Sequence, residues 1–352
     1  MKPIVNKDFT IGVTAVILGL AAGAVLMLLT GNNPVEGYRF LFAGGLMNLE
    51  RVGNTLAMAT PLILTGLSVA FAFRTGLFNI GTPGQVIIGG LAATIVGLTV
   101  DLPKPLLLSL MTLSALAGGA LWGIIPGLLK ARFNVHEVVS GIMMNWIAYW
   151  ITYYLVPAYF KGSFETESRQ ITEAASLKVP WLTALFAGSY INLGLFIALI
   201  AVFIIAVILE KTVLGFQLKA VGFNRHSAEY SGINVNRNII LSMMIAGALS
   251  GLGGAALYTG YASSIQIGVM PSQGFDGIAV ALLGATSPVG VIFAALFFGI
   301  LQSGKGFMNA MTDIPPEIGD TIIACIIYFA ATSILIRNFF DHVANRSRKG
   351  GK

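Results

Sequence analysis

The sequence has few charged residues: Asp, Glu, Lys and Arg make up 10% of its 352 residues. Soluble domains carry about 25%, so the composition excludes an ordinary soluble domain. The single cysteine, Cys325, excludes an internal disulfide and a thiolate metal cluster. His, Asp and Glu do not cluster as metal ligands or catalytic groups would. We therefore expect no enzyme activity, no catalytic residue, no metal and no cofactor.

A nucleotide-binding motif is also missing. The run 299–306 fits a phosphate-binding loop until Gly306, which stands where that loop needs the Ser or Thr that binds magnesium. The run also ends an apolar segment, whereas the loop joins a strand to a helix. The chain therefore has no ATP site of its own. The formal net charge of +6 is spread around apolar segments and does not indicate nucleic-acid binding.

Apolar residues dominate the composition. They make up 56% of the chain, and the mean hydropathy is +0.82. Apolar runs near the length of a transmembrane helix, about 20 residues, recur along the sequence. We predict an all-α, polytopic membrane protein: one transmembrane domain over residues 1–352, about ten transmembrane helices, and interrupted helices in two related halves. The predicted spans are 11–29, 53–73, 85–100, 105–129, 138–156, 192–209, 239–261, 277–285, 288–304 and 317–336.

Charge asymmetry orients these spans. An even number of spans places both termini on one side, where fourteen of the 21 Lys and Arg residues also fall; the other seven fall opposite. Cytoplasmic loops carry the excess of Lys and Arg, so we predict cytoplasmic termini, including the basic tail 346–352. The longest predicted outer loop is 158–190, and 35–45 is predicted as a short interfacial helix.

A broken segment follows the second span. Residues 74–85 contain three glycines and Pro83, which forbid a continuous helix. Unwound backbone at membrane depth is tolerated where it is buried in protein or lines a wet cavity, and broken helices often build transporter sites. Asn79 and Gln85 supply amide groups, so we consider both as substrate-binding residues. The alternative is a plain cytoplasmic turn, with Arg74 obeying the charge rule.

The fifth span carries an amide inside an aromatic face. Asn145 and Tyr149 share one helix face, with Trp146 beside them, and all three are candidate substrate-binding residues. Such a wall suits a flat ligand with hydrogen-bonding edges, because base–aromatic stacking contributes about 1–3 kcal/mol. Two alternatives stay open. Asn145 can bond a neighbouring helix, and the aromatic residues near the outer end can form an interfacial belt.

A second interruption lies in the other half. The eighth span, 277–285, is too short to cross about 30 Å of hydrocarbon. Paired interruptions in two halves point to a central site, and Phe275 at the entrance is a further candidate substrate-binding residue. Asp276 is placed at the N-terminus of this half-helix, where the helix dipole favours it as a cap more than as a ligand.

The loop 210–238 is elaborate for a connector. Asn224 is a good N-cap, Ser227 to Tyr230 can continue a helix, and Gly232 can end it in the left-handed conformation. The result is one or two turns of helix, too polar to enter a bilayer and flanked by basic residues. A plain connection needs only a few residues, so the loop suggests a docking surface on the cytoplasmic side.

Four separated motifs resemble those of one permease family. They are Phe78-Asn-Ile-Gly-Thr-Pro-Gly-Gln85 following Ala59-Thr-Pro-Leu62, the run 134–145, the run 212–254, and Gly274-Phe-Asp-Gly-Ile-Ala-Val-Ala-Leu-Leu-Gly284. The family comprises membrane subunits of bacterial ABC importers for branched-chain amino acids, simple sugars and nucleosides. The run 134–145 is similar to the nucleoside branch, although His136 replaces the Asn that more often precedes Glu there.

The resemblance implies a function. The chain would be the permease subunit of an ATP-driven importer that moves nucleosides across the bacterial cytoplasmic membrane by alternating access. It implies as partners an ATP-binding subunit, a second related permease and a substrate-binding lipoprotein outside the membrane. In this family a short helix of the loop inserts into the ATPase. The residues that the resemblance assigns to that contact are Gly222, Asn224, Ala228, Glu229 and Gly232.

Two other functions remain to be weighed. The same machinery could import a simple sugar such as ribose or galactose, because sugar sites also use amides and aromatic rings. An ion-coupled secondary transporter would work alone but needs an ionisable residue deep in a span. The predicted interior positions contain none, since Glu137, Asp276 and Glu317 fall at span ends.

Overall fold

The computed structural model describes residues 3–332, and side chains from residue 10 on. Within that range the fold is helical, and extended pairing is limited to two isolated bridges. The helices are α1 (Pro3–Leu29), α2 (Pro34–Leu46), α3 (Leu49–Arg74), α4 (Thr82–Thr99), α5 (Lys104–Phe133), α6 (Glu137–Tyr159), α7 (Pro180–Leu185), α8 (Gly194–Lys211), α9 (Val213–Phe223), α10 (Arg225–Tyr230), α11 (Val235–Ala255), the π-helix η1 (Ala256–Tyr261), α12 (Ser272–Leu283), α13 (Pro288–Met311) and α14 (Pro316–Ala331).

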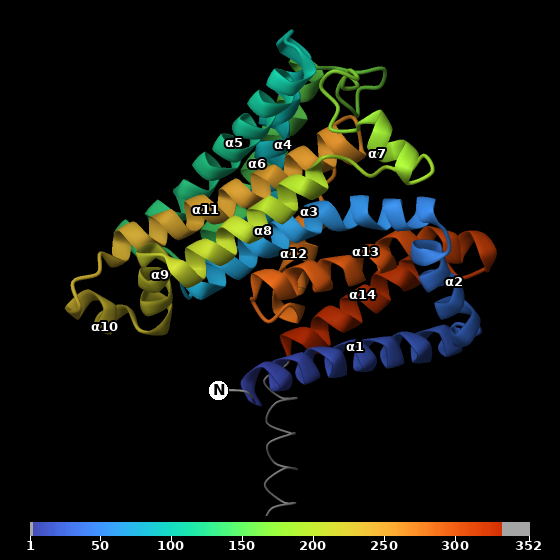
Figure 1. The fold of residues 1–352 in the computed structure, drawn as a ribbon, viewed down its shortest axis with the longest axis horizontal. Coiled ribbons are helices and arrows are strands. Elements are labelled where there is room, and N and C mark those ends of the chain that lie inside the picture. The colour runs from blue at the N-terminus through green and yellow to red at the C-terminus, as the bar shows by residue number, and fades with distance from the viewer. Residues whose placement is uncertain (1–2, 333–352) are drawn as a thin grey trace, which may run out of the picture.

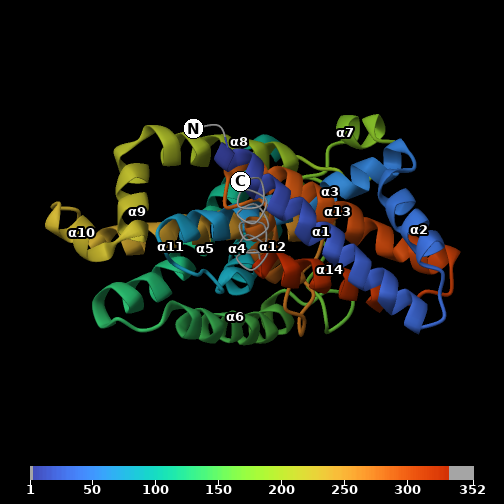
Figure 2. The ribbon, with the colours of Figure 1, turned by 90° about the horizontal axis from the view of Figure 1, so that it is seen from below.

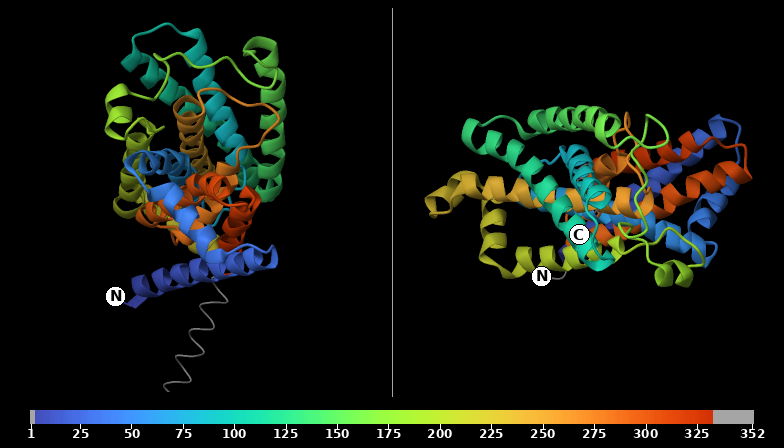
Figure 3. Two further views of the ribbon diagram at one scale, coloured as in Figure 1. Left: turned by 90° about the vertical axis from the view of Figure 1, so that its right-hand side faces the viewer. Right: turned by 90° about the horizontal axis from the view of Figure 1, so that it is seen from above.

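The long helices run roughly between two ends of the molecule. Helices α9 and α10 lie at one end, and α2 and α7 lie at the other (Figures 1 and 2). Helix α1 packs along α14 on the outside of the bundle (Figure 3). Helix α3 runs through the interior, and 83% of its most apolar stretch is buried. This buried helix ends at Arg74, beside the first predicted interruption.

The predicted membrane architecture is confirmed. Seven of the described helices are long and apolar enough to cross a membrane: α1, α3, α4, α5, α8, α11 with η1, and α13. The other three predicted spans coincide with α6, α12 and α14. Helix α12, with 12 residues, is about 18 Å long and cannot cross the bilayer alone. A helix, α2, forms at the residues 35–45 that were predicted as an interfacial helix. The basic tail 346–352 and the end of the last predicted span lie outside the described residues.

Helices α4, α5 and α11 touch through glycine backbones. A methyl group built on Gly251 would lie 2.2 Å from the Ala115 carbonyl oxygen, and one on Gly247 would lie 2.3 Å from the Gly119 carbonyl oxygen. A methyl group on Gly89 would lie 2.2 Å from the Gly251 Cα. Helices in lipid associate through close packing of this kind, because moving an apolar side chain from lipid into a helix interface gains little free energy. The three helices therefore form one tightly packed unit.

The predicted outer loop, 158–190, pairs with the segment that precedes α12. Backbone hydrogen bonds run from Ser168 to Ile265 and from Ile267 to Thr166, at 2.9 Å each. The Lys161 ammonium bonds the Glu165 carboxylate at 2.7 Å and lowers the pKa of that carboxyl. The loop is thus a structured cover over residues 262–271. The sequence did not predict its short helix α7.

Candidate functional site

The first predicted interruption separates α3 from α4. Gly76 has a φ of +70°, which only glycine adopts without strain, and the Leu77 N–H donates back to the Ala72 carbonyl at 3.1 Å. The chain then runs without helix to Thr82, where α4 begins with Pro83 in its first turn. Residues 75–81 are therefore irregular backbone inside a helical bundle, and their polar groups need partners.

A polar cluster next to this segment joins two of the predicted site residues. Asn79 and Gln85 pair through both amides: Asn79 Nδ2 donates to Gln85 Oε1 at 2.9 Å, and Gln85 Nε2 donates to Asn79 Oδ1 at 3.2 Å. Asn79 Nδ2 also donates to Ser68 Oγ at 3.2 Å, and Ser250 Oγ donates to the same atom at 2.8 Å. Asn79 and Gln85 are at most 1% exposed. The cluster links α3, α4 and α11 in the middle of the bundle.

Asn145 joins the same region from α6. Its Oδ1 accepts from the Gly84 N–H at 2.8 Å, and its Nδ2 donates to the Ile80 carbonyl at 2.9 Å. Gly84 lies in the first turn of α4, whose N-terminus has no side-chain cap of its own. Asn145 therefore caps α4 from another helix. The alternative in which Asn145 bonds a neighbouring helix agrees with this geometry, and a role in substrate binding stays a prediction.

Replacing this cap is expected to destabilise the bundle. Asn145→Leu leaves the Gly84 N–H and the Ile80 carbonyl without their partner, and an unsatisfied buried polar group costs about 1–3 kcal/mol. We expect a clearly lower midpoint of thermal unfolding in detergent. Met143→Leu, on the exposed face of the same helix, is the control and should unfold as the parent does. Equal midpoints for N145L and the parent would contradict this role of Asn145.

The aromatic face of α6 points away from the bundle. Trp146 is 51% exposed, and with Trp150 and Tyr154 it lines an apolar groove completed by Met143, Ile147 and Ile151. Tyr149 contacts this face edge-on, with ring centroids 5.5 Å from Trp146 and 5.2 Å from Trp150. Trp146 and Tyr149 thus lie on the predicted helix but apart from the amide cluster. Their aromatic surface is available to a molecule outside this chain.

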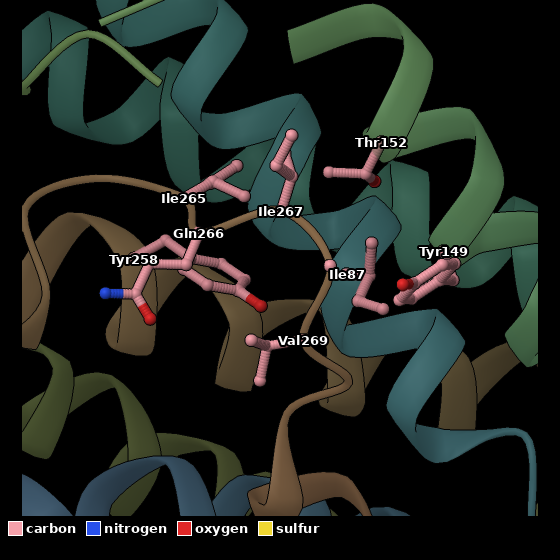
Figure 4. A pocket seen from close by; sticks show the side chains of 9 residues that line it. Ile87, Tyr149, Thr152, Tyr258, Ile265, Gln266, Ile267 and Val269 are labelled. Carbon is pink, nitrogen blue, oxygen red and sulfur yellow. The ribbon is translucent and has the colours of Figure 1, made fainter. Parts of the chain in front are cut away.

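Tyr149 also borders a narrow pocket behind α6. The pocket lies between α4, α6, η1 and the segment that precedes α12, and Tyr149 and Tyr258 flank it from opposite sides (Figure 4). Its lining residues are Ile87, Tyr149, Thr152, Tyr258, Ile265, Gln266, Ile267, Gly268 and Val269. The free space admits about one water molecule. In this conformation the pocket is a mostly apolar crevice flanked by two tyrosine rings, and it does not hold a nucleoside-sized ligand.

The second interruption differs from its predicted form. Helix α12 begins at Ser272, so Asp276 lies in its second turn and does not cap it; the sequence placed the helix start too late because Gly274 and Gly277 are poor helix formers. Asp276 is 9% exposed and accepts from Gln302 Nε2 of α13 at 3.2 Å. Asp276 is thus a buried carboxyl near the start of α12, and the absence of an ionisable residue deep in a span stays a prediction. Phe275, the predicted site residue beside it, is 42% exposed.

The loop 210–238 folds as a capped unit. Asn224 Oδ1 accepts from the Ser227 N–H at 3.1 Å, and α10 ends where Gly232 has a φ of +80°. The Ile233 N–H donates to the Ala228 carbonyl at 3.0 Å and the Gly232 N–H donates to the Glu229 carbonyl at 2.9 Å, which closes the helix. The predicted cap, helix and stop are thus confirmed. The sequence missed α9, the 11-residue helix before it, which Thr212 caps by accepting from the Gly215 N–H at 3.1 Å.

We use the name coupling segment for α9 and α10. The segment exposes two rings at the end of the molecule, because Phe223 and Tyr230 are each 95% exposed. Glu229 is exposed beside them, whereas Ala228 is 4% exposed and anchors the segment to an apolar cluster with Ile239 and Met243. Exposed rings on a well-anchored turn are typical of a protein contact.

The coupling segment rests on the first interruption. A methyl group on Gly222 would lie 2.3 Å from the Arg74 carbonyl oxygen and 2.9 Å from the Gly76 nitrogen. Thr75, between them, shares a hydrogen bond with Ser242 of α11 at 2.8 Å. Glycine is therefore required at position 222 for a backbone-to-backbone contact. The sequence predicted the interruption and an elaborate loop at 210–238, but not that they touch.

Comparison with known families defines the class of protein. Residues 51–331 match the family described as branched-chain amino acid transport system / permease component. The chain therefore belongs to this family of ABC transporter permeases, and it is a multi-pass membrane protein. The matched region begins near the start of α3 and ends at the last residue of α14.

Individual relatives cover almost the whole chain. The guanosine ABC transporter permease protein NupP of Bacillus subtilis (strain 168) is 46% identical over 92% of this chain and 93% of its own. The nucleoside permease protein NupB of Lactococcus lactis subsp. cremoris (strain MG1363) is 40% identical over 94% and 93%. The glucose permease protein TsgB13 of Haloferax volcanii is 33% identical over 93% and 88%. A second guanosine permease of the same Bacillus, NupQ, is 33% identical over 72% and 80%.

Proposed function

We propose that this chain is the membrane-spanning subunit of an ATP-driven importer that carries nucleosides across the bacterial cytoplasmic membrane. The observation that carries the proposal is the identity of 46% and 40% to permeases named for guanosine and nucleosides, over more than nine-tenths of the chain. The glucose permease is more distant, at 33%. Relatives that are transport components also support a transport role over an enzymatic one.

The coupling segment is the proposed dock for an ATP-binding subunit. Two fully exposed rings, Phe223 and Tyr230, give it the anchors that a protein partner buries. Its other side rests on the break between α3 and α4, so a push on the segment reaches the polar cluster. This end of the molecule is then cytoplasmic, in agreement with the charge asymmetry of the sequence.

A second permease and an external lipoprotein complete the proposed assembly. The Bacillus relatives NupP and NupQ, both named as guanosine permeases, support a pair of different permeases. In such a pair the exposed face of α6 would line a passage shared by the two chains. Trp146 and Tyr149 would stack on the base, and Phe275 of α12 would contribute a further ring. The structured outer loop is the proposed landing surface for the lipoprotein.

Uptake measurements test the substrate. Cells that lack this chain should lose uptake of radiolabelled guanosine, and the restored gene should return it. Excess unlabelled uridine or adenosine should compete with guanosine, whereas ribose and glucose should not. Trp146→Ala should raise the apparent KM for guanosine by about tenfold, the loss of one stacking partner, with a matched Leu199→Ala variant on the exposed face of α8 unchanged. Competition by ribose or glucose alone would instead favour the sugar importer.

A further inference from the structure

Arg74 makes two contacts, one through its backbone and one through its side chain. Its carbonyl oxygen is the atom on which Gly222 of the coupling segment rests, since a methyl group there would lie 2.3 Å away. Its guanidinium binds the turn between α12 and α13, where Nε and Nη2 donate to the Thr286 carbonyl at 3.1 and 3.0 Å. One residue therefore touches the coupling segment through its backbone and the second interruption through its side chain.

The turn that Arg74 holds is strained. Ala285 and Thr286 have φ angles of +51° and +53°, a left-handed conformation that is uncommon for non-glycine residues and an outlier for β-branched ones. The turn closes α12 through a 2.8 Å bond from the Thr286 N–H to the Ala281 carbonyl. Strained backbone persists where its surroundings hold it, and it gathers at segments that switch between two conformations.

Helix α12 in turn touches the start of α4 and the interior helix α3. A methyl group on Gly274 would lie 2.5 Å from the Cα of Pro83, in the first turn of α4. Thr65 Oγ1 of α3 donates to the Gln273 carbonyl at 2.9 Å. A shift of α12 therefore moves Phe275 and presses on the start of α4. Helix α12 does not cross the bilayer, so such a shift does not carry a whole span with it.

We propose that Arg74 is a positioning residue that transmits movement of the coupling segment to α12, and that the α12–α13 turn is the segment that changes conformation. The inference rests on the proposed function in one respect, the docking of an ATPase on α9 and α10. Because the guanidinium places two donors on one carbonyl, it fixes the orientation of the Thr286 carbonyl as well as its distance from Arg74. The bond between Thr75 and Ser242 at 2.8 Å holds the end of α3 to α11 without using the Arg74 side chain.

The test follows the exposure of α12. The chain with Cys325→Ser and Phe275→Cys, purified in complex with its partner permease and ATPase, is labelled with a maleimide with and without trapping by ADP and vanadate. With Arg74 present, trapping should change the labelling rate about fivefold, the scale of a typical coupling between sites. Arg74→Gln should bring the change close to none while ATP hydrolysis continues, and Arg74→Lys, which keeps one donor, should restore part of it. Arg132→Gln, which removes an exposed charge at the end of α5, should behave as the parent.

Two results would overturn the proposal. One is a full labelling response in R74Q, and the other is a response in R74Q and R132Q that is lowered equally. If R74Q does not assemble, the comparison passes to R74K, where an unchanged response would be equally fatal. Labelling needs no transported solute. If the labelled parent responds to trapping but the unsubstituted chain, with Phe275 in place, takes up no nucleoside, the substrate assignment is refuted and the Arg74 linkage stands.

Discussion

Gly222→Val is expected to abolish uptake while the chain still inserts in the membrane. Its branched side chain cannot fit where a single added carbon already lies 2.3 Å from the Arg74 carbonyl oxygen and 2.9 Å from the Gly76 nitrogen. The C-terminal turn of α9 must move away from the break after α3, and ATP-driven movement no longer reaches the bundle. We expect a fall in guanosine uptake of about a hundredfold, near the upper range of measured couplings between sites.

The matched control for this variant is Gly306→Val. Gly306 is also a glycine near the end of a helix, but no heavy atom lies within 4 Å of an added Cβ, so uptake should stay near that of the parent. Ala228→Trp gives a second test, because Ala228 is 4% exposed under the coupling segment. Membrane fractions should contain all three variants in similar amounts. Normal uptake by both G222V and A228W would show that the coupling segment is not the contact through which energy enters.

Gly251→Leu is expected to prevent formation of the folded bundle. Gly251 faces two helices at once: an added Cβ would lie 2.2 Å from the Ala115 carbonyl oxygen, and an added Cβ on Gly89 would lie 2.2 Å from the Gly251 Cα. Backbone atoms cannot rotate out of the way as side chains do, so α5 and α4 must separate from α11. The cost exceeds the roughly 1–3 kcal/mol of ordinary overpacking. Gel filtration in mild detergent should show loss of the monodisperse peak.

Gly306→Leu is the matched substitution, with the same added side chain in open space. It should elute as the parent does, which separates the loss of the α4–α5–α11 contact from a general effect of leucine for glycine. Gly251→Ala should give a monodisperse peak of intermediate height in gel filtration. A monodisperse, transport-active G251L protein would show that the three helices need not approach so closely.

Much of the fold follows from hydropathy alone. Bilayer thickness sets the length of a spanning helix, so each predicted span coincides with a helix, from α1 to α14. Caps add local detail: Asn224 and Gly232 mark both ends of α10 because an amide acceptor and a left-handed turn are local requirements. The π-helix η1 was not predicted. The start of α12 at Ser272 was also missed, because tertiary packing overrides the low helix propensity of Gly274 and Gly277.

For the candidate site, the sequence predicted which residues take part but not which groups they bond. The sequence identifies Asn79 and Gln85 as amides in an interrupted segment and Asn145 as an amide inside an apolar helix, and all three are buried near the break before α4. Their hydrogen-bond partners were not predicted. Asn145 bonds Gly84 across 61 positions of sequence, and no local pattern specifies such a pair. The same holds for Arg74 and Thr286, which are 212 positions apart. The positive charge of Arg74 suggested only a cytoplasmic turn.

The glycine contact between α5 and α11 also has a consequence for biogenesis. Its two partners lie far apart in the chain, since Gly123 is translated well before Gly247. A Cβ added on Gly247 would lie 3.0 Å from the Gly123 Cα. At about 5–20 residues per second, the ribosome needs on the order of 6–25 seconds to produce the intervening segment. For that interval the bare backbone groove of α5 faces lipid or the insertion machinery. The contact between α5 and α11 therefore forms only after α11 has been made, more than a hundred residues after α5 leaves the ribosome.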